Sequence, residues 1–118
     1  MLILSNAALR YAVNVCDEKR TSVVIGALDD VWCKRISEQI DLIIRWMGLG
    51  ESIQINTVHL PYATYCYKNG SKIDIVPAET TARGYKCNTL ILQREILDTP
   101  EYSDIFLAME LFGRGEMY

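Results

Sequence analysis

Residues 22–28 read SVVIGAL, a continuous apolar run rich in β-branched residues. A segment that is apolar at almost every position is typical of a strand buried on both faces of a sheet. Asp29 and Asp30 follow it and offer the oxygens and negative charge that suit a helix N-terminus. The sequence therefore predicts a buried strand that leads directly into a helix, which indicates an α/β fold.

Two amphipathic helices, each with one apolar face, are predicted in the first half of the chain. The first begins at Ser5 or Asn6, either of which can cap it. Its apolar face carries Leu9, Ala12, Val13 and Cys16. The second helix follows Asp30 and ends at Gly48 and Gly50. Its apolar stripe consists of Trp32, Cys33, Ile36, Ile40, Ile43, Ile44 and Met47.

The middle of the chain predicts strands. Residues 52–60 alternate apolar with polar side chains until Pro61. Residues 62–67 and 72–76 flank the segment KNGS at 68–71. Asn-Gly between two strand-like runs indicates a hairpin, in which both turn residues are expected to adopt positive φ. We therefore predict that these two strands form an antiparallel hairpin.

One further strand and one further helix are predicted after the hairpin. Residues 87–92 form another apolar run with the character of a buried strand, and we predict that it is a parallel neighbour of the strand at 22–28. Thr99 followed by Pro100 predicts the start of a helix that ends at Gly113. Its stripe consists of Ile105, Ala108, Met109 and Phe112. Because 118 residues show no linker or repeat, we expect one domain that spans residues 1–118.

The composition indicates a folded chain without a broad basic face. Half of the residues are hydrophobic, 23% are charged, and the formal net charge is -3. This balance argues against a nucleic-acid binder that depends on extensive phosphate neutralisation. A local basic cluster remains compatible with it, so nucleic acid is the weaker of the partner hypotheses.

The cysteine pattern argues against a metal site. Cys16, Cys33, Cys66 and Cys87 lie far apart, and the chain has a single histidine, His59. A structural zinc site needs paired ligands at short spacing, so we expect no metal and no cofactor. The start of the chain, MLILSNAALRYAVNV, lacks the basic region of an export signal and is too interrupted for a membrane span. We therefore expect a cytoplasmic protein with buried thiols and no membrane partner.

The segment NGSKIDIVPAETTARGYKCNTLIL at 69–92 carries a resemblance to a known family. The Asn-Gly-Ser hairpin, the Arg-Gly pair at 83–84 and the following apolar strand occur in the order found in the ATPase core of the large terminase subunit of tailed phages. These proteins are the motors that package DNA into capsids. The resemblance covers about residues 6–96. It implies a three-layer α/β fold, here a P-loop-NTPase-like sheet fragment with a β-hairpin.

The chain departs from this family at both parts of the ATPase site. No GxxxxGK[ST] phosphate loop occurs in the sequence, so we expect the fold to lack the loop that wraps the phosphates. The family's acidic pair, which holds magnesium and activates water, corresponds to Gln93 and Arg94. Glu95 lies one residue too far, so we expect it on the opposite face of the strand, and the alternative is a one-residue bulge that brings it back. We therefore expect no ATP hydrolysis and no catalytic residue.

Two groups of residues are candidates for binding. Arg83, Gly84 and Lys86 form a candidate anion site, because the resemblance implies a phosphate contact at the Arg-Gly turn. The alternative is a surface arginine beside a glycine turn. Tyr62, Tyr65, Tyr67 and Tyr85 form a candidate partner surface or a platform for stacking a base. The alternative for these tyrosines is a half-buried place in the sheet.

The missing phosphate-loop strand predicts association. In the family-like core this strand lies between the strands at 22–28 and 87–92, so its loss leaves open edges unless these strands pair with each other. We expect a homo-oligomer or a phage or host protein partner. The competing possibility is that the leading segment MLIL itself pairs as a strand.

Two function classes follow from these observations. The first is a non-hydrolytic phage or prophage protein derived from the terminase ATPase core, acting in or around DNA packaging. The second is a small phage interaction protein, such as an inhibitor of a host defence system, that keeps the scaffold for binding alone. A fold does not decide between them, because function depends on a site.

Overall fold

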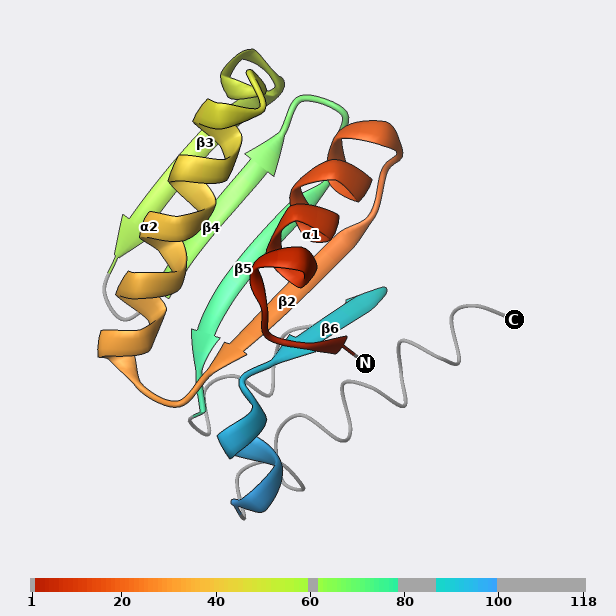
Figure 1. Cartoon of the computed structure of the whole chain (residues 1–118). Coiled ribbons are helices and arrows are strands. Elements are labelled where there is room, and N and C mark those ends of the chain that lie inside the picture. Colours follow the sequence, from red (N-terminus) through yellow and green to blue (C-terminus); the bar gives the residue numbers. More distant parts are fainter. Residues whose placement is uncertain (1, 60–61, 79–86, 100–118) are drawn as a thin grey trace.

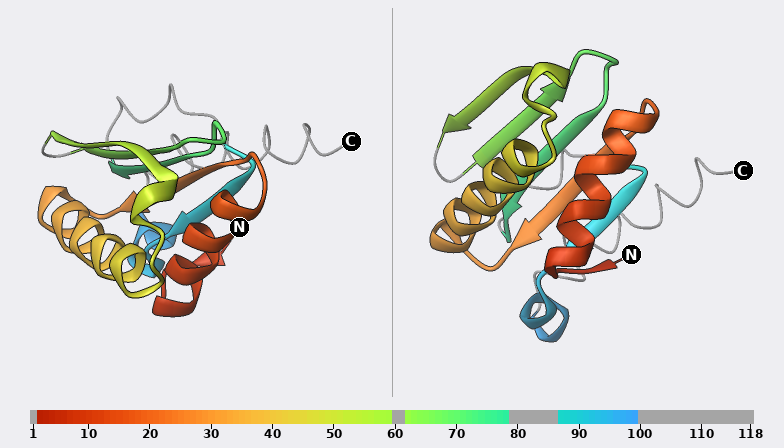
Figure 2. Two further views of the ribbon diagram at one scale, coloured as in Figure 1. Left: turned by 90° about the horizontal axis from the view of Figure 1, so that it is seen from above. Right: turned by 45° about the horizontal axis from the view of Figure 1, so that its top comes forward.

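A six-stranded mixed sheet runs through the described part of the chain, and two α-helices cover one of its faces (Figure 1, Figure 2). The computed structural model describes residues 2–59, 62–78 and 87–99, and it leaves the side chains of residues 55–62 undescribed. The elements are β1 (Leu2–Ile3), α1 (Asn6–Glu18), β2 (Ser22–Ala27), α2 (Asp30–Trp46), η1 (Gly50–Ser52), β3 (Ile53–His59), β4 (Tyr62–Tyr67), β5 (Lys72–Pro77), β6 (Thr89–Leu92) and η3 (Arg94–Asp98). This arrangement confirms the predicted α/β class.

The strands lie in the order β1-β6-β2-β5-β4-β3. The first four are parallel, whereas β4 runs antiparallel to β5 and to β3. Val24 lies opposite Leu90 and Ile25 opposite Ile91, so the predicted parallel pairing of the strands at 22–28 and 87–92 is confirmed. The predicted antiparallel hairpin is confirmed as well, since β4 pairs with β5.

The helix boundaries follow from their caps. The Oγ atom of Ser5 accepts a hydrogen bond from the backbone N–H of Ala8 at 3.0 Å, so Ser5 is the N-cap of α1. Asp29 caps α2 in the same way, as its Oδ1 accepts from the N–H of Trp32 at 2.9 Å. Gly48 follows the end of α2 with φ of 70°, a conformation that favours glycine. The caps predicted for both helices are therefore confirmed.

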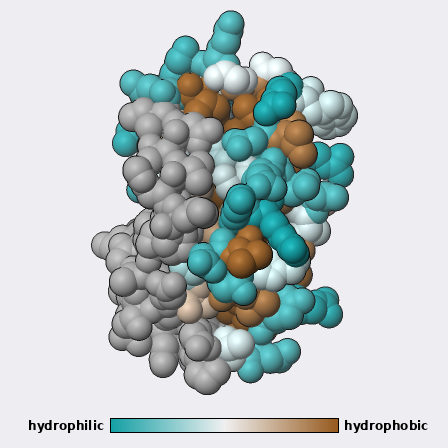
Figure 3. Space-filling view, turned by 90° about the vertical axis from the view of Figure 1, so that its left-hand side faces the viewer, coloured by the Kyte–Doolittle hydropathy of each residue, from teal (hydrophilic) through white to brown (hydrophobic). Residues whose placement is uncertain are grey.

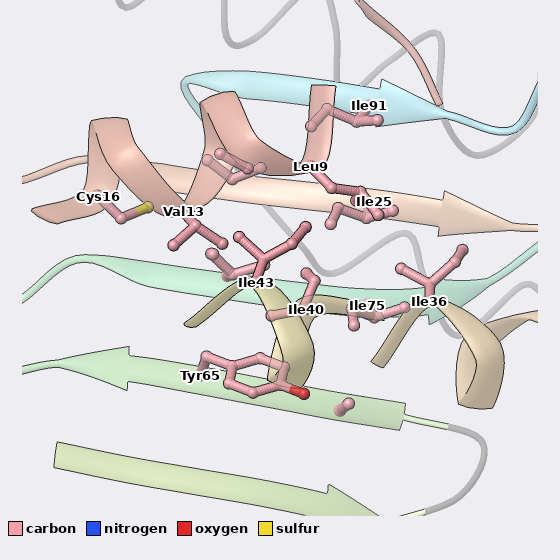
Figure 4. Close-up of a cluster of buried hydrophobic side chains, with 14 of the residues drawn as sticks. Leu9, Val13, Cys16, Ile25, Ile36, Ile40, Ile43, Tyr65, Ile75 and Ile91 are labelled. Atoms are coloured by element: carbon pink, nitrogen blue, oxygen red, sulfur yellow. The ribbon is translucent and has the colours of Figure 1, made fainter. Parts of the chain in front are cut away.

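The main core lies between the two helices and the sheet (Figure 4). Leu9, Val13 and Cys16 of α1 face the part of the sheet that contains Ile25 and Ile91. The buried stripe of α2 packs over the neighbouring strands, with Ile36, Ile40 and Ile43 near Ile75 and Tyr65. These contacts bury the apolar faces that the periodicity predicts for both helices.

A second apolar cluster lies on the opposite face of the sheet. It comprises Val24, Val76, Cys87, Leu90, Leu92 and Ile96. Neighbouring residues of a strand point to opposite faces, so β2 contributes Val23 and Ile25 to the main core and Val24 to the second cluster. The run at 22–28 is therefore apolar throughout because β2 is buried on both sides.

The hairpin turn differs from its prediction in one respect. Gly70 has φ of 92°, but no residue other than glycine has positive φ in the described part of the chain. The turn is closed by a hydrogen bond from the N–H of Tyr67 to the carbonyl oxygen of Ser71 at 2.8 Å, which leaves a loop of three residues. The expectation that both Asn69 and Gly70 have positive φ is wrong, because such a loop needs a left-handed residue only at its last position.

The N-terminal segment forms a strand, β1. It lies on the outer side of β6 and not between β2 and β6, where the phosphate-loop strand was expected. β1 pairs in parallel with β6, with Leu2 opposite Ile91. β6 also pairs directly with β2. No gap therefore separates the strands at 22–28 and 87–92, and the argument for association through open edges there is overturned. The competing expectation, that the MLIL segment pairs as a strand, is confirmed.

Two further expectations concern the ends of the chain and the membrane. The C-terminal helix predicted after Thr99 lies outside the described residues. Among the described helices, none is long and apolar enough to cross a membrane.

Candidate functional site

Ligands of open α/β sheets bind outside the carboxyl ends of the parallel strands. In this protein that edge is formed by the residues that follow β1, β2, β5 and β6. Figure 1 shows the N-termini of α1 and α2 at the same end of the sheet. A nucleotide site, if the chain has one, is expected at this edge, so we describe the side chains that lie there.

Gln93 closes the edge between β6 and β2. Its side chain is buried, and its Oε1 accepts a hydrogen bond from the backbone N–H of Leu28 at 2.9 Å. Its own N–H donates to the carbonyl oxygen of Gly26 at 3.1 Å. Both groups of Gln93 therefore bind the backbone of β2 and of the residue after it. The Gln93 side chain therefore links two strand ends instead of facing a ligand.

The residues after Gln93 do not continue the strand. β6 ends at Leu92, and Arg94 and Glu95 begin the short helix η3 with exposed side chains. The expectation that Glu95 lies on the opposite face of a strand is wrong, because the backbone turns before it. Within the described residues, no three histidine, cysteine, aspartate or glutamate side chains come together as a metal site.

The helix N-termini at this edge are already occupied by side chains. Only Leu4 and Ser5 separate β1 from α1, and Ser5 caps the helix. Asp29 likewise occupies the N-terminus of α2 with a carboxylate. A phosphate group at either helix would have to displace these caps, and Asp29 would repel it.

Two of the predicted surface tyrosines lie in the core. The Tyr65 and Tyr67 side chains are buried, with 0% and 2% of their surface exposed. The hydroxyl of Tyr65 bonds to the Ser37 hydroxyl at 2.7 Å and donates to the Asp41 carboxylate at 2.9 Å. The hydroxyl of Tyr67 donates to the carbonyl oxygen of Val13 at 3.0 Å. Neither residue forms a partner surface, because both point toward the helices.

Burial also changes the acidity of groups in the main core. Loss of water contact raises the pKa of Tyr65 and of Tyr67 above the usual tyrosine value. The same cause raises the pKa of the Cys16 thiol to about 12. These groups are therefore neutral at physiological pH, and none has the lowered pKa of a reactive nucleophile.

The other predicted site residues are not placed by the structure. Arg83, Gly84, Tyr85 and Lys86 lie outside the described residues. Tyr62 begins β4, and its side chain is also outside the description. The candidate anion site therefore stays a prediction.

The opposite edge of the sheet carries a hollow that the sequence analysis missed. It has a volume of about 470 Å³ and is lined by Arg20, Thr21, Ser22, Gly70, Lys72 and Asn88. Sequence analysis could not find it, because nothing near Arg20 in the sequence shows which strands begin beside that residue. We call these six residues the basic hollow.

A second depression lies between the helices. It is lined by Asn6, Arg10, Gln39, Leu42, Ile43 and Trp46, and we call it the helix groove. Trp46 is 76% exposed and Leu42 is 51% exposed, although both are large apolar residues. On the side of the molecule seen in Figure 3, the apolar surface is broken into separate areas among hydrophilic side chains.

No protein-family model, curated protein or solved structure matches the chain. The function is therefore argued from the described residues and from the sequence motifs alone.

Proposed function

We propose that the protein is a non-hydrolytic phage or prophage protein derived from the ATPase core of the large terminase subunit, and that it acts by binding in or around DNA packaging. The sequence motifs between residues 6 and 96 carry the family part of this proposal. The mixed sheet with its two helices is compatible with the three-layer α/β fold that the resemblance implies. The hydrogen bonds of Gln93 support the non-hydrolytic part.

The bond from Leu28 to Gln93 is the observation on which non-hydrolysis depends. A carboxylate in this position would bind magnesium through its oxygens. The Gln93 oxygen is neutral, and its hydrogen bond already satisfies it. Because Arg94 follows, the nearest charge along the chain is positive and repels the metal ion.

Phosphate release from ATP tests the proposal. We expect the purified protein with magnesium to release phosphate no faster than buffer does. Release above background that is lost in Glu95→Gln, but kept in the matched variant Glu38→Gln on α2, would contradict it. Glu95 and Glu38 are both exposed, so the pair separates a site effect from a change of net charge.

The packaging part has its own test. In the first class, the chain is either a truncated motor segment or the complement of a separate chain that supplies the phosphate loop. A flanking open reading frame that ends in a phosphate loop would support this class. A genomic neighbourhood without phage packaging genes would argue for the second function class.

The helix groove favours the homo-oligomer among the expected partners, with a second copy of this chain bound at the groove. Exposed tryptophan is typical of residues that carry much of the energy of an interface. Trp46 and Leu42 together give the groove an exposed apolar area. An interface between two identical copies can bury such an area on both at once.

Light scattering at micromolar concentration tests this dimer. We expect a mass of twice 13.4 kDa for the protein and a monomer for Trp46→Ser. Val31→Ser is the matched control, because Val31 is an exposed apolar residue of α2 outside the groove. A monomeric wild type, or a dimer that persists in Trp46→Ser, would contradict the assignment.

A further inference from the structure

The basic hollow lies where β2, β5 and β6 begin, at the edge opposite the one that Gln93 closes. Two cations, Arg20 and Lys72, are among its lining residues. Among the described residues that line it there is no carboxylate. The whole chain has a net charge of -3, whereas the charged residues that line this hollow are both positive.

The Arg20 side chain lies over the glycine of the hairpin turn. A Cβ atom at Gly70 would come within 3.1 Å of the Arg20 Nε atom. The close approach leaves the guanidinium beside the hollow, and within the described residues Arg20 has no ion pair. Its donors are therefore available to an anion. Lys72, in contrast, already pairs with Asp74 at 3.3 Å and contributes less net charge.

The backbone around Arg20 is held in place by the hairpin. The hydroxyl of Ser71 donates to the carbonyl oxygen of Lys19 at 2.9 Å and accepts from the N–H of Thr21 at 3.0 Å. The N–H of Lys72 donates to the carbonyl oxygen of Thr21. Arg20 thus stands between two anchored residues, and a side chain on a fixed backbone loses less entropy when it binds a ligand.

Asn88, which also lines the hollow, supplies a further hydrogen-bond donor. Asn88 Oδ1 accepts hydrogen bonds from the backbone N–H and the hydroxyl of Ser22 and from the hydroxyl of Thr21. These bonds fix the side-chain amide with its oxygen toward β2. The Nδ2 group of Asn88 has no partner among the described residues. An amide donor and a guanidinium on one hollow suit an oxyanion.

We propose that the basic hollow binds a phosphate group through Arg20, Lys72 and the Asn88 side-chain amide. Its described lining contains no aromatic ring, so the site recognises phosphate and not a base. Two sources share this chemistry, a nucleic-acid backbone and free phosphate. The inference goes beyond the proposed function, because it concerns the other edge of the sheet and holds whether or not ATP is hydrolysed.

Binding measurements with two probes test the proposal. Inorganic phosphate is titrated into the isotope-labelled protein while the Asn88 side-chain amide signal is followed by NMR. A labelled single-stranded DNA oligonucleotide is titrated at low salt by fluorescence anisotropy. We expect Arg20→Gln to weaken binding by about tenfold, the loss typical of one charge-assisted hydrogen bond. The affinity should also fall as salt is added.

Two variants make the result specific. Asn88→Asp keeps the acceptor for Ser22 and Thr21 but places a carboxylate in the hollow, so it should abolish binding while the protein stays folded. Arg35→Gln removes the same charge from the N-terminal half of α2, at the opposite end of the strands, and should change the affinity by less than about twofold.

Each outcome decides the proposal or the source of the phosphate. Signal changes with both probes support a nucleic-acid backbone, and changes with inorganic phosphate alone support a free phosphate ligand. Equal weakening by Arg20→Gln and Arg35→Gln would overturn the proposal, because it would show that only net charge matters. Wild-type protein that binds neither probe at low salt would overturn it as well.

Discussion

For the single residue Gln93, the sequence predicted one property and not another. Its identity predicts that no magnesium ligand stands at this position. Its role as a link between β6 and Leu28 was not predictable, because the two residues are 65 positions apart and the bond depends on the register of two strands. A place within the sheet was one of the two predictions for Tyr65 and Tyr67, but their hydrogen-bond partners were not predictable, since these partners belong to the helices.

Replacement of Gln93 by alanine should destabilise the protein. The N–H of the half-buried Leu28 loses its acceptor, and the loss of one such hydrogen bond costs about 0.5–1.5 kcal/mol. We expect a decrease of this size in the free energy of unfolding, measured by urea denaturation. Arg94→Ala is the control, since its side chain is exposed and should change stability by less than about 0.5 kcal/mol. Equal effects of the two variants would show that the bond contributes nothing.

The buried thiol of Cys16 predicts a loss of stability at alkaline pH. Burial raises its pKa from 9.0 to about 12, so the folded state keeps a proton that the unfolded state releases. This stabilisation is fully present below pH 9 and is lost as the pH rises toward 12. One group contributes a slope of up to about 1.4 kcal/mol per pH unit.

Urea denaturation at several pH values between 8 and 10.5 measures this slope. Cys16→Ala should make it shallower above pH 9. Val13→Ala removes another buried side chain of α1 but no titrating group, so it should lower stability without changing the slope. An unchanged slope in Cys16→Ala would contradict the assignment.

The hairpin turn shows what changes at the scale of an element. The Asn-Gly-Ser motif predicts a turn, and the structure adds that the turn also caps the C-terminus of α1. Asn69 Nδ2 donates to the carbonyl oxygen of Cys16 at 2.7 Å, and Ser71 bonds to Lys19 and Thr21. Helix ends have carbonyl groups without helical partners, and here a distant turn supplies donors for them. No local pattern in the sequence indicates this contact.

Ser71→Ala should therefore loosen α1 as well as the hairpin. The Ser71 side chain is 1% exposed, and its loss removes two hydrogen bonds, one to the carbonyl oxygen of Lys19 and one from the N–H of Thr21. We expect a loss of about 1–3 kcal/mol in the free energy of unfolding. Hydrogen exchange should become faster in the last turn of α1. Lys68→Ala, an exposed change in the same turn, should leave both unchanged.

At the scale of the whole molecule, hydrophobic patterns predicted most elements and one neighbour relationship correctly. The pairing of β2 with β6 followed from their shared apolar character. The position of β1 on the outer side of β6 did not follow, because two paired residues carry too little pattern to specify a neighbour. The basic hollow escaped for a similar reason, since its residues come from three strand starts and a turn.

The buried centre of the sheet predicts the outcome of one charge substitution. Ile91 is 0% exposed and lies between β1 and β2, so Ile91→Asp places a charge without a partner in the core. We expect this variant to be unfolded by circular dichroism at 25 °C. Val31→Asp is the control, because Val31 is exposed in the first turn of α2, where a carboxylate is tolerated. A folded Ile91→Asp variant with unchanged thermal stability would refute this position for β6.

The place of β6 in the sheet has a consequence for how the chain folds. β6 is the last strand of the described chain, yet it lies between β1 and β2, which are the first two. During synthesis, α1, α2 and the strands β1 to β5 are made before β6, and only β6 connects β1 to the other strands. Contacts between segments so far apart form slowly, and apolar strand edges stay exposed in the meantime. The first strand that is made is therefore among the last that can pair.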